Sequence, residues 1–439
     1  MTAAVDLTRR GKDIVVLEAR DRIGGRVATV VHEGIGIEVG GQWVSPGHNC
    51  MHELIEAAGV ELVGPQEGAL LIRSQGEVFR SPAAPDRSHA LTPFEMADLG
   101  QGVLRFRRLA ERVKSDPNWA AANVAWLGQP LSRWVKANLR TPAAQSDFSA
   151  ILANVGEGIN GDVSLGRALA TTVNGTDLES LFAVSGGLKL RRVVGGMHQL
   201  ADHLAAQLPE ACLQLQQVVT GIDHDPEGVT VHTEAGDGTT RAHRARRVLV
   251  TLPPWLALRL PYNPPLPAWC DEAVQRQTSG HVIKVFAIYP TPWWREDGLS
   301  GQMSADEGPV RVTFDISDGD GPGILMGFFE GVEAATLSGR SQAIRERAFI
   351  DSLAAVFGEQ ARQPHVYLDY DWAADKYTRG CHTPHFAPGA WSVNGQLLAE
   401  PAGPIRFAGA EYVGKSNGYL EGAVRSGHDE AKAILRELG

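Results

Sequence analysis

The pattern of apolar and polar positions near the start of the chain predicts a helix followed by a buried strand. Residues 2–10 place small and apolar side chains on one face, and Gly11 is typical of the residue that ends a helix. Residues 14–17 form a short apolar run of the kind found in buried parallel strands, and Glu18 follows directly. A helix, a glycine, an apolar strand and a terminal acid make up the second half of a dinucleotide-binding βαβ unit.

The front half of that unit would have to precede Met1. A whole unit needs a first strand and a glycine-rich turn, which amounts to about 20–30 further residues. We therefore expect either a natural start upstream of Met1, which we favour, or a true truncation with impaired nucleotide binding. Without the first strand, the apolar edge beside residues 14–17 would be unpaired.

Further α/β signals occur in pieces that are far apart in the sequence. Residues 82–182 are predicted to be mainly helical. The strand-like runs that follow are residues 218–231, 248–252, 281–289 and 405–408, and residues 418–438 predict a strong terminal helix. The separation of these signals indicates one nucleotide-binding domain made of discontinuous segments, with a second domain inserted between them.

We therefore predict an α/β fold with an α+β second domain. The Rossmann-like nucleotide-binding domain, of the FAD-binding type, is expected to comprise residues 1–75, 190–265 and 385–439. Residues 76–189 and 266–384 are expected to form the inserted substrate-binding domain.

Composition narrows the class of protein. The 439 residues are 43% hydrophobic and 21% charged, as in ordinary globular proteins, and the formal net charge of −10 argues against a nucleic-acid-binding surface. The four cysteines show no close pairs, and no apolar run approaches the length of a membrane span. We expect a cytoplasmic protein with no membrane anchor. Zinc, P-loop and serine-hydrolase motifs are absent from the sequence.

Glu18 and the residues after it carry the first chemical signal. A carboxylate at the end of this strand can accept hydrogen bonds from both hydroxyls of an adenosine ribose. Gly24 and Gly25 then allow the backbone to approach a diphosphate closely, and Arg26 supplies a bidentate positive charge. A plain turn requires neither the arginine nor its spacing from the acid, so we favour a nucleotide site.

With these residues identified, the segment from Val16 to Arg26 resembles the opening of the flavin-containing amine oxidases, the monoamine oxidase family. A single Gly-Gly-Arg would be weak, because desaturases and other flavoproteins share it. Here the resemblance runs from end to end in the family's order. It continues through residues 38–43, 194–197, 263–267, 282–284, 407–411 and 418–423.

The resemblance implies FAD as the cofactor and assigns residues to it. Glu18 would hold the adenosine ribose with Arg20 close by, and Gly25 and Arg26 would lie at the pyrophosphate. The N–H of Leu420 would meet the flavin pyrimidine edge, at the positive end of the last helix. The other implied contacts are Gly41, Gln42 and Trp43 along the ribityl chain and flavin, Val219 at the adenine, and Glu411 at the ribityl phosphate.

Two further residues are singled out beside the flavin. Lys284 lies in an apolar strand-like run, where a lysine is costly without a partner, and the resemblance implies that it holds a water against flavin N5. Cys381 stands nine residues after Trp372, where mitochondrial monoamine oxidases carry the cysteine linked to the flavin 8α carbon. A covalent link through Cys381 and a buried free cysteine beside non-covalent FAD are equally open.

The family's substrate cage uses two aromatic side chains in front of the flavin. Tyr419 matches one wall, whereas the other is His382, where the mitochondrial enzymes have tyrosine. The mitochondrial enzymes also place a glutamine after the glycine pair that corresponds to Gly186 and Gly187, and none stands here. The amine preference therefore cannot be copied from those members.

The resemblance implies an oxidase of a primary or secondary amine. Hydride passes to flavin N5, the imine hydrolyses to an aldehyde, and oxygen is reduced to hydrogen peroxide. The alternatives are a polyamine or putrescine oxidase and an L-amino-acid oxidase; a desaturase is less favoured. The non-enzyme alternative is an FAD-deficient remnant or interaction module. A homodimer is expected from the resemblance only.

Overall fold

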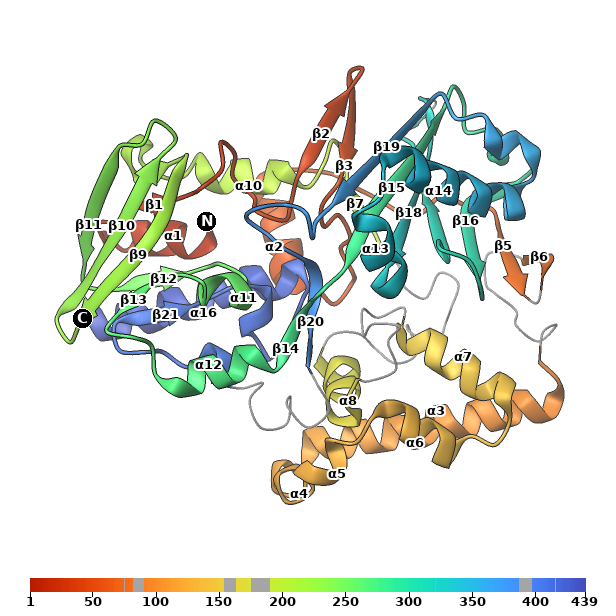
Figure 1. Ribbon diagram of the computed structural model, residues 1–439, viewed down its shortest axis with the longest axis horizontal. Helices are drawn as coiled ribbons and strands as arrows, with labels where there is room; N and C mark the ends of the chain where they lie inside the picture. Colours follow the sequence, from red (N-terminus) through yellow and green to blue (C-terminus); the bar gives the residue numbers. More distant parts are fainter. Residues whose placement is uncertain are drawn as a thin grey trace.

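The elements of the computed structural model gather into two lobes along the long axis of the molecule (Figure 1). The first lobe holds both chain termini, and the second lobe is built around the largest sheet. The structure describes residues 1–74, 76–81, 91–153, 163–174, 190–319, 321–386, 397–414 and 416–439.

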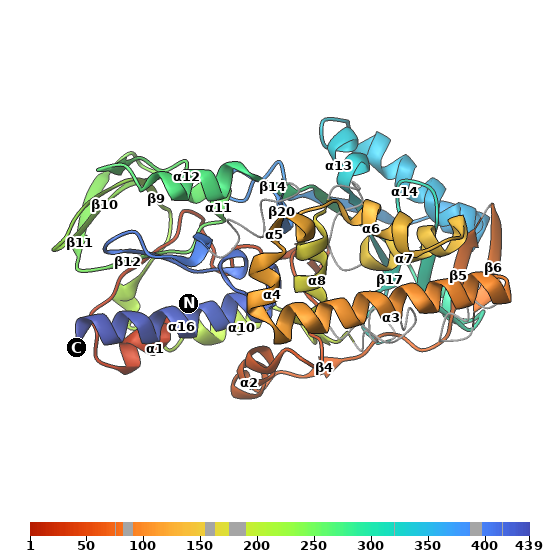
Figure 2. The ribbon, with the colours of Figure 1, turned by 90° about the horizontal axis from the view of Figure 1, so that it is seen from below.

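Two helices from opposite ends of the chain pack together in the first lobe. Helix α1 (Thr2–Arg9) lies against the last helix, α16 (Leu420–Leu438) (Figure 2). Gly11 follows α1 with a φ of +69°, a left-handed conformation that suits glycine. The structure therefore confirms both predicted helices and the role of Gly11 at the end of the first. The shared apolar cluster includes Ala3, Leu7, Ala431 and Ile434.

Short parallel strands bring distant segments into one layer of the first lobe. Strand β1 (Val16–Leu17) pairs with β8 (Leu213–Gln214), and β12 (Val248–Val250) pairs with β21 (Ile405–Phe407). Among the described residues, β1 has β8 as its single strand partner, and the adjacent Val15 is exposed. The strands predicted around residues 14–17, 248–252 and 405–408 are therefore present, and all are parallel.

A four-stranded sheet with the order β11-β10-β9-β13 forms the outer end of the first lobe (Figure 1). The sequence pattern favoured one alternating run over residues 218–231, whereas the structure has an antiparallel pair of strands. Strand β9 (Gln217–Asp225) ends where the Asp225 carboxylate accepts two backbone N–H groups of the turn, and β10 (Gly228–Ala235) returns beside it. The other strands are β11 (Thr240–Ala245) and β13 (Tyr262–Asn263).

The second lobe contains a seven-stranded sheet with the order β19-β15-β18-β17-β16-β5-β6. All eight positions of β15 (Val282–Tyr289) are buried, which explains why all of them except Lys284 are apolar or aromatic. Strand β5 (Ala69–Ser74) belongs to this sheet, so the first segment of the first lobe ends before residue 69 and not at the expected residue 75. The remaining strands are β6 (Glu77–Ser81), β16 (Leu299–Ala305), β17 (Val312–Asp315), β18 (Gly323–Glu330) and β19 (Val366–Asp371).

Different elements cover the two faces of this sheet. Helices α13 (Gly331–Ser338) and α14 (Gln342–Phe357) pack on one face through a core that includes Phe349. On the other face, Trp372 and the hairpin of β2 (Thr29–His32) and β3 (Ile35–Glu38) form a second core. This second core includes Trp43, Trp372 and Cys381, which belong to the candidate site.

A layer of helices lies below the sheet, and Figure 2 shows α3 (Pro93–Ser115) running along it. The Thr92 hydroxyl accepts the N–H of Glu95, and the Glu95 carboxylate accepts the N–H of Thr92, so a capping box starts α3. This layer confirms the helical prediction for much of residues 82–182. The other helices here are α4 (Pro117–Ala122), α5 (Val124–Leu127), α6 (Leu131–Asn138), α7 (Pro142–Ala153) and α8 (Leu165–Asn174).

Strands β14 (Gln277–Gly280) and β20 (Cys381–Phe386) pair between the two lobes (Figure 1). In the part of the chain that the structure describes, no helix is long and apolar enough to cross a membrane. The remaining helices and strands are α2 (Asn49–Ala58), β4 (Leu62–Val63), β7 (Arg192–Val193), α10 (His198–Ala205), α11 (Pro254–Ala257) and α12 (Ala268–Gln275).

Candidate active site

The candidate site starts at the carboxyl end of β1, where Glu18 and Arg20 lie together. The Glu18 carboxylate accepts the backbone N–H of Arg20 at 2.8 Å, and the Arg20 guanidinium reaches Asp375 at 2.5 Å. Burial alone would raise the pKa of Asp375, but the Arg20 charge and hydrogen bonds from Tyr370 and Thr378 hold it below its ordinary value. Arg20 is therefore anchored beside Glu18 by an ionised partner from a distant part of the chain.

Val219 of β9 lies close to Glu18 and Arg20. The N–H of Gln217 donates to the carbonyl oxygen of Glu18 at 2.9 Å, so the start of β9 is tied to the tip of β1. Val219, two residues further along β9, packs at the edge of the first lobe's core. The structure thus brings Glu18, Arg20 and Val219 to one corner of the first lobe.

Arg26 and Glu411 form an ion pair in the next part of the candidate site. The Arg26 guanidinium makes a two-point pair with the Glu411 carboxylate, at 2.5 Å and 2.8 Å. The Glu411 side chain is 1% exposed and that of Arg26 is 24% exposed. Burial would lower the pKa of Arg26, but the charge and hydrogen bond of Glu411 raise it, so the guanidinium keeps its positive charge. Two residues that the resemblance assigned to the phosphate region are therefore direct partners.

Glycines shape the backbone around this pair. Gly24 and Gly25 have φ angles of +93° and +58°, and a Cβ added at Gly25 would meet open space. A Cβ at Gly40 would come within 2.2 Å of the Arg26 carbonyl oxygen, so only glycine fits there. A Cβ at Gly41 would be 3.5 Å from the Leu420 side chain. The Gly40–Gly41 turn therefore lies between Arg26 and the start of α16.

The N-terminus of α16 points its donors at the same region. Its N-cap residue, Tyr419, makes no side-chain capping hydrogen bond. The first N–H groups of an α-helix have no acceptor within the helix and carry a partial positive charge. These uncapped donors, the open space at Gly25 and the Arg26 charge suit a ligand with a diphosphate and hydrogen-bond acceptors, and a flavin dinucleotide fits this description.

Lys284 is the central charged residue of the site. Its side chain lies in the middle of β15 and is 3% exposed. The ammonium donates to the carbonyl oxygens of Glu38 at 2.6 Å and Gly40 at 3.0 Å, and to the side-chain oxygen of Gln42. Burial lowers the pKa of Lys284 to about 7, against the opposing charges of Glu38 and Cys381. A group that titrates near neutrality thus lies at the centre of the site.

Trp372 and Cys381 lie near Lys284. The Trp372 indole N–H donates to the carbonyl oxygen of Val39 at 2.8 Å, which fixes the turn that carries Gly40 to Trp43. Trp43 packs against Phe314 with ring centroids 5.3 Å apart. Cys381 begins β20 close enough to Lys284 and Arg26 to influence the pKa of both. None of the four cysteines, all in described stretches, forms a disulfide.

Of the two predicted walls of the substrate cage, the structure describes the side chain of one. Tyr419 lies at the N-terminus of α16, beside the residues that contact Gly41. His382 follows Cys381 in β20, but its side chain is outside the described part, as are Gly186 and Gly187. The structure therefore places Tyr419 at the site and leaves the His382 ring as a prediction.

The structure also reveals residues that the sequence did not single out. The His48 ring lies edge-on to Tyr419 with centroids 5.5 Å apart, and it accepts the N–H of Ser45 at 3.2 Å. Burial lowers the pKa of His48 to about 4, so the ring is neutral. Nearby, the fully buried Glu421 carboxylate accepts the Met51 N–H and pairs with Arg425 at 2.6 Å. His48 lies in no matched motif, and Glu421 lies in the matched stretch 418–423 but was assigned no role there.

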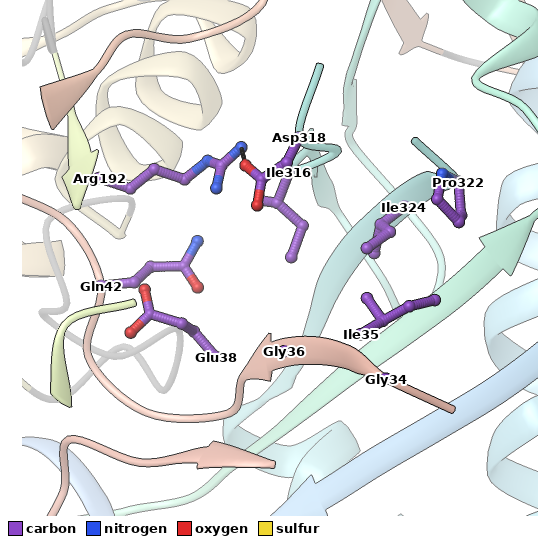
Figure 3. Close-up of a pocket in the computed structure, with 10 residues that line it drawn as sticks. All are labelled: Gly34, Ile35, Gly36, Glu38, Gln42, Arg192, Ile316, Asp318, Pro322 and Ile324. Atoms are coloured by element: carbon purple, nitrogen blue, oxygen red, sulfur yellow. Dashed lines mark ion pairs between the residues drawn. The ribbon is translucent and has the colours of Figure 1, made fainter. Parts of the chain in front are cut away.

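A cavity of about 280 Å³ opens beside Gln42, on the side of the hairpin β2–β3 (Figure 3). Ile35, Ile316 and Ile324 form its apolar wall, and Arg192 pairs with Asp318 at its rim at 2.6 Å. The Glu38 carboxylate, which accepts the N–H of Met197, also lines it. The cavity was not predicted, because its walls come from three separate segments of the chain.

Comparison with known proteins identifies the chain's relatives. The model of the family described as flavin containing amine oxidoreductase matches residues 1–435. The chain belongs to this family. It is 33% identical to the Mycobacterium tuberculosis protein named as a flavin-containing monoamine oxidase, AofH, over all of this chain and 94% of that protein.

Solved structures of the same family have the same fold. Putrescine oxidase bound to putrescine superposes with a TM-score of 0.90 at 28% identity, covering 99% of this chain and 96% of the other. Cyclohexylamine oxidase from Brevibacterium oxydans gives a TM-score of 0.88 at 28% identity, over 100% of this chain and 96% of that chain. The predicted fold class and family are confirmed. The protein is a flavin-containing amine oxidoreductase, which favours an enzyme over the remnant or interaction module.

Proposed function

We propose that the protein binds FAD along the line from Glu18 to Lys284 and oxidises a primary or secondary amine. Glu18 would accept hydrogen bonds from the ribose, Arg26 would face the diphosphate, and the N–H of Leu420 would meet the flavin pyrimidine edge. When bound, the flavin accepts a hydride from the carbon next to the amine nitrogen and passes the electrons to oxygen. The imine released would hydrolyse to an aldehyde.

The single observation that carries this proposal is the burial of Lys284 between Glu38, Gly40 and Gln42. A lysine in the middle of a fully buried strand is costly, and its pKa near 7 is of the kind found at functional sites. In an amine oxidase, this side chain would lie beside the flavin ring, at its N5 edge. Its neighbours on the other lobe, Gly41 and Leu420, would contact the ring from the opposite side.

The substrate class follows from the walls of the cage. Tyr419, backed by the neutral His48 ring, and His382 would hold the amine as its free base, because a charged ammonium cannot donate a hydride. Putrescine and cyclohexylamine are the ligand and substrate named for two related structures. A diamine and a cyclic monoamine are therefore the first compounds to compare, with L-amino acids as the third class.

Covalent attachment is a separate part of the proposal. Cys381 lies at the start of β20, near the charges of Lys284 and Arg26, and its sulfur would link to the flavin 8α carbon. The test is acid precipitation of the purified protein and of the Cys381→Ala variant. Flavin absorbance that stays in the wild-type pellet and leaves the variant's pellet supports the link. Flavin released from both refutes it.

The domain organisation forms the last part of the proposal. The first lobe, with residues 1–68, 190–265 and 385–439, would bind FAD, and the second lobe would supply the substrate walls. Oxygen as the electron acceptor and a homodimeric assembly also belong to this proposal.

Peroxide formation is the direct test of the activity. The flavin-loaded protein would be assayed for hydrogen peroxide with putrescine, spermidine, cyclohexylamine, benzylamine and a set of L-amino acids. Peroxide with one of the first four compounds supports an amine oxidase and ranks its substrates. Peroxide with amino acids only would replace the proposal by an L-amino-acid oxidase, and no peroxide with any compound would reject it.

A further inference from the structure

Gln42 joins Lys284 to the cavity beside the hairpin β2–β3. Of the three acceptors that hold the Lys284 ammonium, two are backbone carbonyl oxygens and the third is the Gln42 side-chain oxygen. A protonated amine has three hydrogens to donate, so these three acceptors use all of them. Gln42 is therefore the one side chain, among the described residues, whose replacement would remove a hydrogen-bond acceptor of this ammonium.

The other end of the Gln42 amide faces the cavity. Gln42 is 2% exposed, and its Nε2 has no hydrogen-bond partner among the described protein atoms. Figure 3 shows the amide pointing into the cavity, between Glu38 and the Arg192–Asp318 pair. A buried N–H donor without an acceptor is rare in folded proteins, so the cavity is expected to supply one.

The cavity has the size and polarity to hold water. Its volume of about 280 Å³ exceeds by several-fold the roughly 30 Å³ that one water molecule occupies in the liquid. Its rim is solvent-facing, because the Asp318 side chain is 64% exposed. The Arg192 guanidinium and the Glu38 carboxylate add polar partners along the way to Gln42. Polar lining and an open rim favour ordered water over an empty apolar void.

We propose that Gln42 is a positioning residue for Lys284 and that the cavity is a water-filled inlet whose inner water holds the Gln42 amide. Water accepts from Nε2, which turns the amide oxygen toward the Lys284 ammonium. The geometry of the lysine thus depends on the hydration of a cavity on the far side of Gln42. This inference depends on the contacts of the chain and not on the amine that the enzyme oxidises.

Other charges also act on Lys284 and set the direction of the expected effects. Glu38 on β3 and Cys381 on β20 both favour the protonated lysine, whereas burial disfavours it. Burial also raises the pKa of Glu38, which Arg192 and His198 oppose. With these groups unchanged, the loss of the Gln42 oxygen removes one hydrogen bond to the charged form, so the pKa of Lys284 must fall.

The test measures the titration of Lys284 directly in the purified holoprotein. Lysine labelled with ¹³C at Cε gives NMR signals that follow the protonation of each side chain, and the Lys284 signal is assigned by its loss in Lys284→Met. The wild-type midpoint should lie near the value of about 7.

Two changes at Gln42 should move this midpoint in opposite directions. Gln42→Met keeps the volume but removes the oxygen, so the ratio of neutral to protonated Lys284 at a given pH should rise by about tenfold. Gln42→Glu keeps an oxygen and adds a negative charge, so the midpoint should rise above that of the wild type. Unchanged midpoints in both folded variants would overturn the positioning role.

Filling the cavity tests the water inlet separately. Gly36 lines the cavity, and a Cβ added there would have Thr29 as its nearest neighbour at an ordinary contact distance of 3.5 Å, so Gly36→Val adds volume at the cavity wall. The variant should lower the Lys284 midpoint in the same direction as Gln42→Met, by a smaller amount. The matched control is Val31→Leu, on the same hairpin but 72% exposed, which should match the wild type. If Gly36→Val behaves like Val31→Leu, the inlet is refuted.

Discussion

The pair of Arg26 and Glu411 offers the sharpest stability prediction. Arg26 lies in the loop after β1, and Glu411 follows β21, so their two-point contact joins segments 385 residues apart. The Glu411 carboxylate is almost fully buried. We consider Arg26→Met, which keeps the length of the stem but leaves that carboxylate without its partner.

The expected cost follows from this burial. Removing one partner of a buried ion pair typically costs about 3–5 kcal/mol, because the remaining charge is left uncompensated. Arg26 is 24% exposed, so water can reach the vacated position and the lower end, about 3 kcal/mol, applies. Unfolding entropy scales to about 0.9 kcal/mol per kelvin for 439 residues, so Tm should fall by roughly 3 °C.

Calorimetry of the flavin-free protein would measure this shift without the ligand's own contribution. The double variant Arg26→Met with Glu411→Gln buries no charge and should recover most of the loss. The matched control is Arg107→Met, in the exposed pair of Arg107 and Glu111, where a change of less than about 1 °C is expected. If Arg26→Met shifts Tm no more than the control, or the double variant is no better than the single one, the reasoning fails.

Two further predictions concern pH. The pKa of His48 in the folded protein is about 4, below its ordinary 6.5, so the folded state binds fewer protons than the unfolded state between these values. Stability should therefore fall, by up to about 3 kcal/mol, as the pH drops from 6.5 to 4, and His48→Phe should flatten this part of a Tm-against-pH curve. An equally steep curve for the variant would contradict the assignment. Glu330 has the opposite sign, because burial raises its pKa from 4.5 to about 7. Stability from its neutral form is present below pH 4.5 and lost as the pH rises through 7, so Glu330→Gln should raise Tm at pH 8 and leave it unchanged at pH 4; equal Tm values at pH 8 would refute this.

Much of the fold could be predicted because its elements carry local signals. The helix at residues 2–10 ends at a glycine in the left-handed conformation, and β15 is apolar except at Lys284 because both its faces are covered. The hairpin of β9 and β10 was missed although Asp225, Pro226 and Gly228 are turn residues, because the alternation on both sides of them was interpreted as one strand. Strand β5 was assigned to the wrong segment because sheet membership depends on partners far away in the chain.

In the candidate site, too, some residues could be predicted from local sequence and their partners could not. Glu18, Arg26 and Lys284 were found because each stands in an unusual local context, such as a lysine within an apolar strand. Their partners could not be paired from the sequence: Asp375 with Arg20, Glu411 with Arg26, and Gln42 with Lys284 each join distant segments. The orientation of a side chain toward such a partner is fixed by tertiary packing, which no periodicity records.

Anaerobic mixing of the flavin-loaded protein with an amine shows directly whether the protein transfers electrons from amines to its flavin. Absorbance near the flavin band would be followed with putrescine, cyclohexylamine and benzylamine in turn, with Lys284→Met and Arg107→Met as active-site and surface variants. We expect at least one amine to bleach the flavin of the wild-type protein, and air to restore the band with formation of peroxide. Arg107→Met should bleach and recover as the wild-type protein does. A flavin that stays oxidised with every amine would contradict the account.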